Sequence, residues 1–190
     1  MLQLTTFHYS IYFFVAEMKV LITGSPGVGK TTLIKSLCED LTQCSGFYTE
    51  EIREGGKRIG FDIVTLDGSS RAPLARVNTS VKGPKVGQYT VILSDFEFLA
   101  QKSLNSKSIA NSHHVIIDEI GKMENFSSKF QAMVRQIFDS DSKHILATIP
   151  VKYDSIGLVK EIVNRSDTEI IEVTKDNRDS IKDIILQKLI

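Results

Sequence analysis

The stretch Gly24-Ser25-Pro26-Gly27-Val28-Gly29-Lys30-Thr31 decides the fold of this chain of 190 residues. It has the pattern G-x-x-x-x-G-K-T. An apolar run, Val20 to Ile22, precedes it, and a segment with apolar residues at helical spacing follows: Leu33, Ile34, Leu37 and Leu41. The sequence therefore predicts a strand, a glycine-rich loop and a helix in succession, which is the context in which this pattern binds phosphate.

The fixed positions of this phosphate-binding loop (P-loop) have physical reasons. Glycines let the backbone wind tightly and bring its N–H groups close to phosphate oxygens. Because the loop opens a helix, unpaired N–H groups and the positive end of the helix dipole meet the anion. Lys30 adds a positive charge at the terminal phosphates, and Thr31 offers a hydroxyl to Mg²⁺, which prefers oxygen ligands. We therefore expect Gly24 to Thr31 to bind the phosphates of a nucleotide.

A second chemical centre is predicted where the run His114-Val115-Ile116-Ile117-Asp118-Glu119 ends. A continuous apolar run is typical of a strand buried on both faces, and ligands of α/β sheets gather at the carboxyl ends of strands. Asp118 should therefore lie beside the P-loop and hold Mg²⁺ through a coordinated water, while Glu119 acts as the general base toward the attacking water. The alternative is that both acids only solvate the end of the strand.

Composition limits the class of protein. The length suits one α/β domain, and equal counts of basic and acidic residues, 23 each, argue against nucleic acid or an acidic membrane as a partner. Cys38 and Cys44 form no C-x-x-C motif, so we expect reduced thiols in a cytoplasmic, or also nuclear, protein. A monomer is expected.

Residues 1–17 differ from the rest because they are aromatic and apolar. The run is too short for a membrane helix, which takes ~20 residues, and lacks the positive start of a secretory signal. We expect an N-terminal extension of uncertain order: either Met18 is the natural start, or residues 1–17 are a loose or edge-pairing extension. A single domain is expected over residues 18–190. The alternative is a membrane-tethering or targeting leader.

Four further local features are predicted. Residues 47–53 and 58–66 flank paired glycines and predict a hairpin, and residues 69–85 are expected to be a surface loop. Ser94 and Glu97 match a capping box, which predicts a helix beginning after Ser94. Thr148 lies near the end of another buried strand, where it either senses the γ-phosphate or satisfies backbone groups.

Together these residues resemble the cancer-related nucleoside-triphosphatase family, small P-loop NTPases also known from thermophilic microbes. The resemblance covers nearly everything from Met18 onward and lies in these blocks: Thr23 to Lys35, Gly46 to Glu51, Arg58 to Asp62, Val86 to Tyr89, Asp118 to Glu124, Thr148 to Val151 and Val173 to Arg178. It implies hydrolysis of ATP, GTP and other nucleoside triphosphates with Mg²⁺ and loose base selectivity. It also implies nucleotide binding at these residues: Gly24 to Thr31, and Val115, Ile116, Ile117, Asp118, Glu119, Ile120 and Gly121.

The expected fold is therefore α/β, a P-loop NTPase with a mostly parallel central sheet, helices on both faces and an inserted β-hairpin. The predicted catalytic residues are Lys30 and Glu119, and the predicted metal ligands are Thr31 and Asp118. An additional arginine is to be sought among Arg53, Arg58, Arg71 and Arg76. Two alternatives remain open: a small-molecule P-loop kinase, and a nucleotide-binding regulatory module with slow turnover.

Overall fold

A nine-stranded sheet, in the order β5-β6-β4-β3-β2-β7-β8-β1-β9, forms the centre of the computed structural model, which describes residues 17–190. The strands are β1 (Lys19–Thr23), β2 (Cys44–Glu54), β3 (Lys57–Thr65), β4 (Arg71–Arg76), β5 (Lys85–Val86), β6 (Tyr89–Val91), β7 (His114–Ile117), β8 (His144–Thr148) and β9 (Thr168–Glu172). The helices are α1 (Lys30–Asp40), α2 (Leu93–Ser103), α3 (Ser106–Ala110), the 3-10 turn η1 (Glu124–Phe126), α4 (Ser128–Phe138), α5 (Gly157–Val163) and α6 (Ile181–Leu189).

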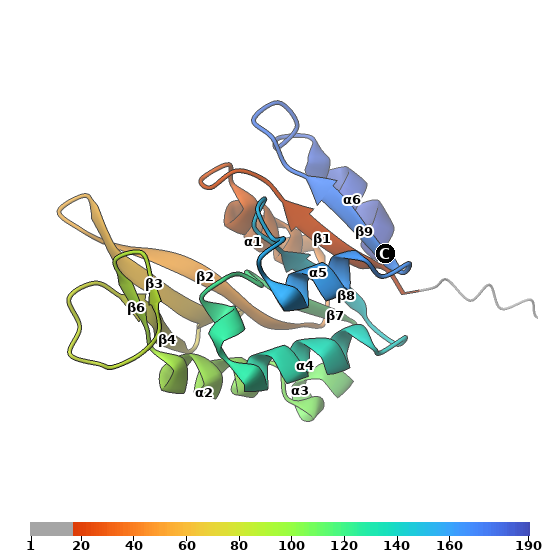
Figure 1. Ribbon diagram of the computed structural model, residues 1–190. Coiled ribbons are helices and arrows are strands. Elements are labelled where there is room, and N and C mark those ends of the chain that lie inside the picture. The colour runs from red at the N-terminus through yellow and green to blue at the C-terminus, as the bar shows by residue number, and fades with distance from the viewer. Residues whose placement is uncertain (1–16) are drawn as a thin grey trace, which may run out of the picture.

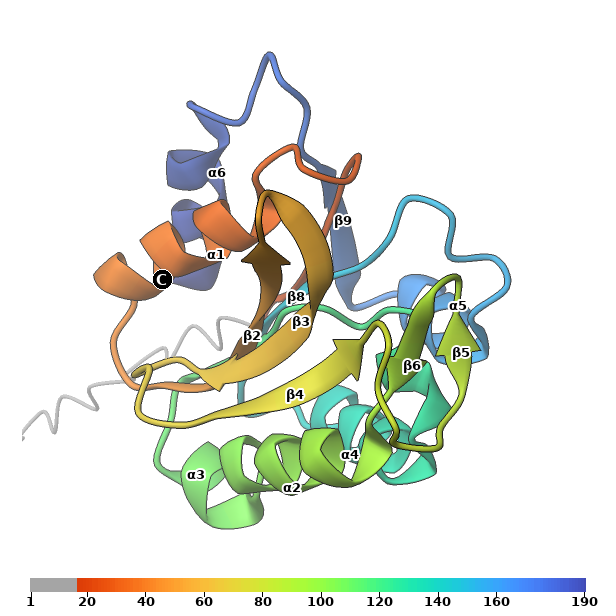
Figure 2. The ribbon, with the colours of Figure 1, turned by 90° about the vertical axis from the view of Figure 1, so that its left-hand side faces the viewer.

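The half of the sheet from β2 to β9 is parallel and is covered on both faces. Helices α1 and α6 lie on one face, and α2 to α5 on the other (Figures 1 and 2). Alternation along β1 serves both layers: Val20 and Ile22 join the hydrophobic cluster of α1 and α6, whereas Leu21 joins the other cluster. Each such fully buried side chain contributes roughly 1.5–3 kcal/mol relative to an exposed one.

The half from β2 to β5 is antiparallel, so it is larger than the single hairpin that was predicted. Strand β4 occupies part of the segment 69–85 that was expected to be a loop. Its Leu74 and Ala75 are buried against α2, and this packing outweighs the neighbouring Pro73. Phe47 on β2 joins the two halves, because its ring lies 6.2 Å from Phe96 of α2 and 6.0 Å from Phe130 of α4.

The predicted capping box was wrong. Helix α2 begins at Leu93, with Ile92 as its N-cap, so Ser94 lies inside the helix. Glu97 bonds to another helix instead, since its carboxylate accepts from the Ser127 hydroxyl at 2.8 Å and from Lys129 at 2.9 Å. Ser127 in turn caps α4, so a tertiary partner has replaced the local one.

The carboxyl ends of the parallel strands meet at one edge of the sheet, where the loops after β1, β7, β8 and β9 lie together (Figure 1). Gly24 shows how close they come: a Cβ there would lie 2.4 Å from the backbone oxygen of Val173, after β9. Beyond Phe47, β2 continues past its last pairing with β7 and projects, with β3, beside the P-loop (Figure 2).

The prediction for the N-terminal extension lies outside the described residues, apart from Glu17. Within residues 17–190, no helix combines the length and the apolar character needed to cross a membrane.

Candidate active site

The P-loop connects β1 to α1. Gly27 and Gly29 have φ values of +74° and +114°, a backbone region that side chains disfavour, which explains why glycine occupies both positions. Helix α1 begins at Lys30, and among the described residues no side chain caps its N-terminus. The amides of its first turn are therefore available to an anion.

Lys30 and Thr31 project from the start of α1 in two directions. The Lys30 ammonium donates a hydrogen bond to the Gly24 carbonyl at 2.8 Å, so it folds back over the loop. The Thr31 hydroxyl donates to Oδ2 of Asp118 at 2.7 Å. That bond uses the proton of Thr31 and leaves its oxygen lone pairs for a cation.

Asp118 is buried behind Thr31, and the residue is 1% exposed. Its Oδ2 accepts from Thr31 and its Oδ1 accepts from the hydroxyl of Thr148, at the end of β8. Burial raises the pKa of Asp118, while these hydrogen bonds favour its ionised form. Thr148 therefore bonds a carboxylate, a partner that was not predicted for it.

Glu119 faces the P-loop and has a strongly shifted acidity. Burial, with the charge of Asp118 second, raises the pKa of Glu119 to about 7, and Lys30 opposes the rise. A carboxylate with a pKa near neutrality can take up a proton from water and release it again at physiological pH. This is the property that a general base needs.

A third acid, Glu124, lies near Asp118 and Glu119, and no role was predicted for it from the sequence. It is 4% exposed and accepts a hydrogen bond from the Gly121 amide at 3.1 Å. Burial, and then the charge of Glu119, raises its pKa to about 8. A Cβ on Gly121 would lie 2.6 Å from Glu119 Oε1 and 2.8 Å from Glu124 Oε2, so the two carboxyl groups approach each other where Gly121 has no side chain.

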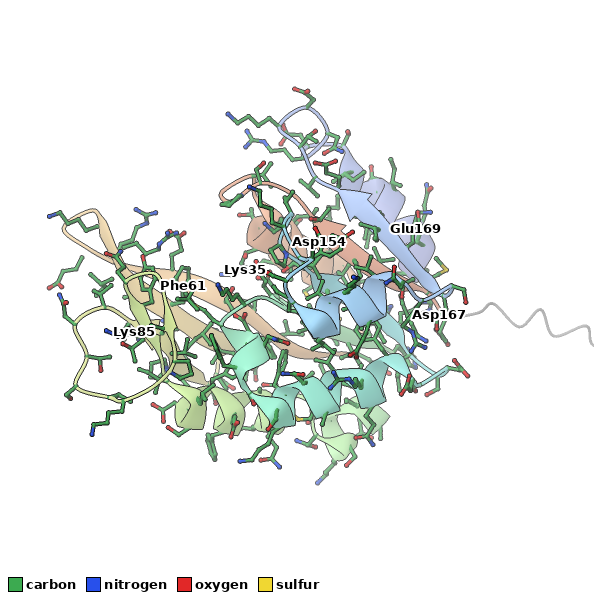
Figure 3. All side chains as sticks on the ribbon, in the orientation of Figure 1. Lys35, Phe61, Lys85, Asp154, Asp167 and Glu169 are labelled. Atoms are coloured by element: carbon green, nitrogen blue, oxygen red, sulfur yellow. The ribbon has the colours of Figure 1, made fainter. Side chains whose placement is uncertain are left out.

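A cavity of about 490 Å³ lies between the P-loop and the β2–β3 hairpin, and Glu119 is the one of the three acids that lines it. Its lining residues are Gly24, Pro26, Gly27, Gly29, Lys30, Thr31, Thr32, Thr49, Glu50, Glu51, Arg58, Phe61, Glu119, Pro150 and Val151. Glu50 of β2 pairs with Lys35 of α1 at 2.6 Å and ties the hairpin to the P-loop helix. Figure 3 labels Lys35 on α1 and Phe61 across from it on β3.

Of the fifteen residues predicted to bind nucleotide, seven line this cavity: Gly24, Pro26, Gly27, Gly29, Lys30, Thr31 and Glu119. Ser25 is exposed on the loop, and Val28 is buried in the cluster of α1 and α6. The side chains of Val115, Ile116, Ile117 and Ile120 are fully buried in the two apolar layers. Their segment therefore reaches the cavity through Glu119, while Asp118 lies beneath Thr31.

Comparison with known proteins adds independent findings. A family model described as NTPase matches residues 19–186. The chain is 50% identical over 173 residues to nucleoside-triphosphatase THEP1 of Thermotoga sp. strain RQ2, covering 90% of this chain and 95% of that protein. It is 47% identical over 174 residues to the human cancer-related nucleoside-triphosphatase, covering 85% of this chain and 91% of that protein. The crystal structure of THEP1 from the hyperthermophile Aquifex aeolicus matches with a TM-score of 0.80 at 42% identity, covering 90% of this chain and 99% of that one.

Proposed function

The chain belongs to the NTPase family whose model spans residues 19–186, and from this premise we propose that it hydrolyses ATP, GTP and other nucleoside triphosphates to diphosphate and phosphate with the help of Mg²⁺. It is a nucleoside-triphosphatase with an α/β P-loop NTPase fold, as its relatives are, and the predicted family resemblance is confirmed. We propose the substrate range, the metal and the residue roles.

One arrangement carries the proposal: Lys30, Thr31 and Glu119 line one cavity, and Asp118 supports Thr31 from below. In-line phosphoryl transfer needs a cradle for the phosphates, a place for a cation and a group that orients water. The P-loop amides and Lys30 supply the first, Thr31 with Asp118 the second, and Glu119 the third.

The donor set fits Mg²⁺. The Thr31 hydroxyl and the Asp118 carboxylate are hard oxygen ligands, and Asp118 already holds Thr31 with its lone pairs free. We propose that Thr31 binds the ion directly and Asp118 through a water. When bound, Mg²⁺ would neutralise charge on the phosphate oxygens and lower the pKa of the nearby carboxyl groups.

The protein's own residues carry the proton and the charge. Glu119 accepts a proton from the attacking water, whose oxygen forms the new bond to the γ-phosphorus as the bond to the β–γ bridging oxygen breaks. Lys30, released from the Gly24 carbonyl, binds the oxygens of the terminal phosphates. The P-loop amides hold the diphosphate that leaves.

The test is phosphate release from ATP, GTP, CTP and UTP with and without Mg²⁺, on the full chain and on the Lys30→Ala variant. We expect release from all four nucleotides with Mg²⁺ and near-complete loss in the variant. Formation of nucleoside diphosphate only after an acceptor is added, without release of phosphate, would favour a kinase. Tight binding with turnover near ~10⁻⁴ s⁻¹, the scale of an unassisted P-loop site, would favour a regulatory module. Either result would overturn the proposal.

We propose further that residues 18–190 act as one domain, that the protein is monomeric, and that it works in the cytoplasm. Both cysteines are unpaired thiols, which supports a reducing compartment. Light scattering of the purified chain and fractionation of cells test the last two statements.

A further inference from the structure

One arginine lies at the cavity, and it comes from the β2–β3 hairpin. Of the four arginines that the sequence offered, Arg58 lines the cavity together with Lys30 and Glu119, and the other three are absent from its lining within residues 17–190. Arg71 is paired with Glu50 and Asp62, and Arg76 with Asp62. The structure therefore favours Arg58 among the four arginines that the sequence did not distinguish.

The Arg58 guanidinium is held in place on two sides. It lies over the ring of Phe61, with 5.0 Å between its carbon Cζ and the ring centroid, and its Nε donates to the Tyr89 hydroxyl at 2.9 Å. A planar guanidinium that stacks on a ring and bonds through Nε keeps its remaining N–H groups in a fixed plane. Such a group can address two phosphate oxygens at once.

Glu51 is the counter-ion of Arg58. Nη1 of Arg58 donates to Glu51 Oε1 at 2.5 Å, and Glu51 itself lines the cavity. About 40% of each side chain is exposed, and exposed ion pairs contribute little because water screens them. Phosphate oxygens that carry more charge than one carboxylate can therefore replace Glu51 at little cost.

We propose that Arg58 stabilises the charge that develops on the γ-phosphate during hydrolysis, and that Glu51 holds it ready until a triphosphate displaces the carboxylate. This inference rests on the proposed function, because it assigns a role at the same site. Arg58 donates hydrogen bonds and exchanges no proton. The proton of the attacking water goes to Glu119, and the diphosphate leaves with the electron pair of the broken P–O bond.

The test compares Arg58→Ala with Arg53→Ala as its matched control. Arg53 lies on the same hairpin and also pairs with Glu51, at 2.6 Å, but does not line the cavity. We expect Arg58→Ala to lower kcat roughly 10³-fold, the lower end of what such arginines supply, and to change the Kd of a non-hydrolysable ATP analogue less than about threefold. Arg53→Ala should retain kcat.

A second readout separates a catalytic role from a structural one. ADP with aluminium fluoride mimics the transferring phosphoryl group, so wild type and Arg53→Ala should bind it far more tightly than ADP alone, and Arg58→Ala should not. Arg58→Lys keeps a charge but loses the fork, so kcat should stay within about tenfold of the alanine variant. This variant serves if Arg58→Ala does not fold.

The displacement step has its own test in Glu51→Gln. Because the amide pairs more weakly with Arg58, the variant should bind the ATP analogue a few-fold more tightly and ADP unchanged. The inference is overturned if Arg58→Ala turns over like wild type, or if it loses analogue binding in proportion to kcat. Absence of phosphate release from wild type would instead overturn the proposed function itself.

Discussion

The hydroxyl of Thr148, on β8, donates a hydrogen bond to the carboxylate of Asp118, at the end of the neighbouring strand β7, in a region from which solvent is excluded. Thr31 bonds the other carboxylate oxygen at 2.7 Å. Two donors on two oxygens fix the plane of the acid beneath the proposed cation position. The pairing therefore links the sheet to the P-loop through one carboxylate.

Replacing Thr148 with valine removes one donor and preserves the shape of the side chain. The Asp118 carboxylate then loses a buried partner, so we expect a loss of stability of about 1–3 kcal/mol and a roughly 10- to 100-fold weaker response to Mg²⁺. Titration of phosphate release with Mg²⁺ measures the second effect. Thr148→Ser keeps the hydroxyl and is the control. An unchanged Mg²⁺ requirement in the valine variant would argue against the role given to Thr148.

Activity should depend on the ionisation of Glu119. The pKa of this carboxyl is raised to about 7, mainly by burial, and the proposed base must be ionised to accept a proton. Hence kcat/KM should rise with pH through about 7 and then level off. More Mg²⁺ should move this limb to lower pH, since a nearby cation favours the carboxylate. A flat profile between pH 5 and 9 would contradict the assignment.

Glu119→Gln tests the same residue without a change of pH. The amide retains the size of the side chain but accepts no proton, so we expect ATP binding to persist and kcat to fall by roughly 10²- to 10⁴-fold. Equilibrium binding of a fluorescent ATP analogue and single-turnover hydrolysis separate the two quantities. Glu39→Gln, an exposed acid on α1, is the control and should behave as wild type.

The parts of the site that sequence reasoning found depend on local pattern. The P-loop needs contiguous glycines, and Asp118 and Glu119 follow directly from a buried strand that ends at the ligand edge. The role of Thr148 depends on β8 lying beside β7, and no local pattern in the sequence predicts that pairing. The sequence does not distinguish Arg58 from the other three arginines, because its place in the cavity depends on how the hairpin lies beside the P-loop.

The errors in predicting the fold have the same origin. Strand β4 forms where a loop was expected, because its buried face packs on α2. Glu97 does not form the predicted capping box because its carboxylate accepts hydrogen bonds from Ser127 and Lys129, which lie in a distant segment. Both outcomes come from tertiary contacts that compete with local preference. For Glu97, the two tertiary partners lie 30 and 32 residues away in the sequence.

Glu124 should make the protein less stable at high pH. Its pKa is about 8 in the folded chain against 4.5 as the ordinary value, so the folded state holds a proton that the unfolded state releases. Stability is therefore greatest below about pH 4.5 as far as this group is concerned, and falls as the pH rises through about 8. Glu124→Gln stays neutral at all pH values and keeps an acceptor for the Gly121 amide.

Urea unfolding of wild type and Glu124→Gln at pH 5, 7 and 9 measures this difference. The variant should gain stability relative to wild type between pH 5 and pH 9, by an amount on the order of a few kcal/mol. Parallel pH profiles would show that Glu124 is ionised in the folded protein, contrary to the prediction.

Gly121→Ala tests whether the approach of the two acids matters to the reaction. A Cβ there would meet Glu119 Oε1 at 2.6 Å and Glu124 Oε2 at 2.8 Å, so at least one carboxyl group must move. We expect a stability loss of about 1–3 kcal/mol from overpacking, and a fall in kcat with ATP-analogue binding retained, because the P-loop is untouched.

Gly157→Ala, at the first residue of α5, is the matched control. No described atom, apart from its chain neighbours and its own helix backbone, lies within 4 Å of the position of its Cβ. That alanine should be neutral or stabilise by about 0.4–1 kcal/mol. If Gly121→Ala loses stability but keeps kcat, the moved group is Glu124 and its position does not affect catalysis. If it loses neither, the crowding at Gly121 is relieved without disturbing the acids, and their close approach has no part in the mechanism.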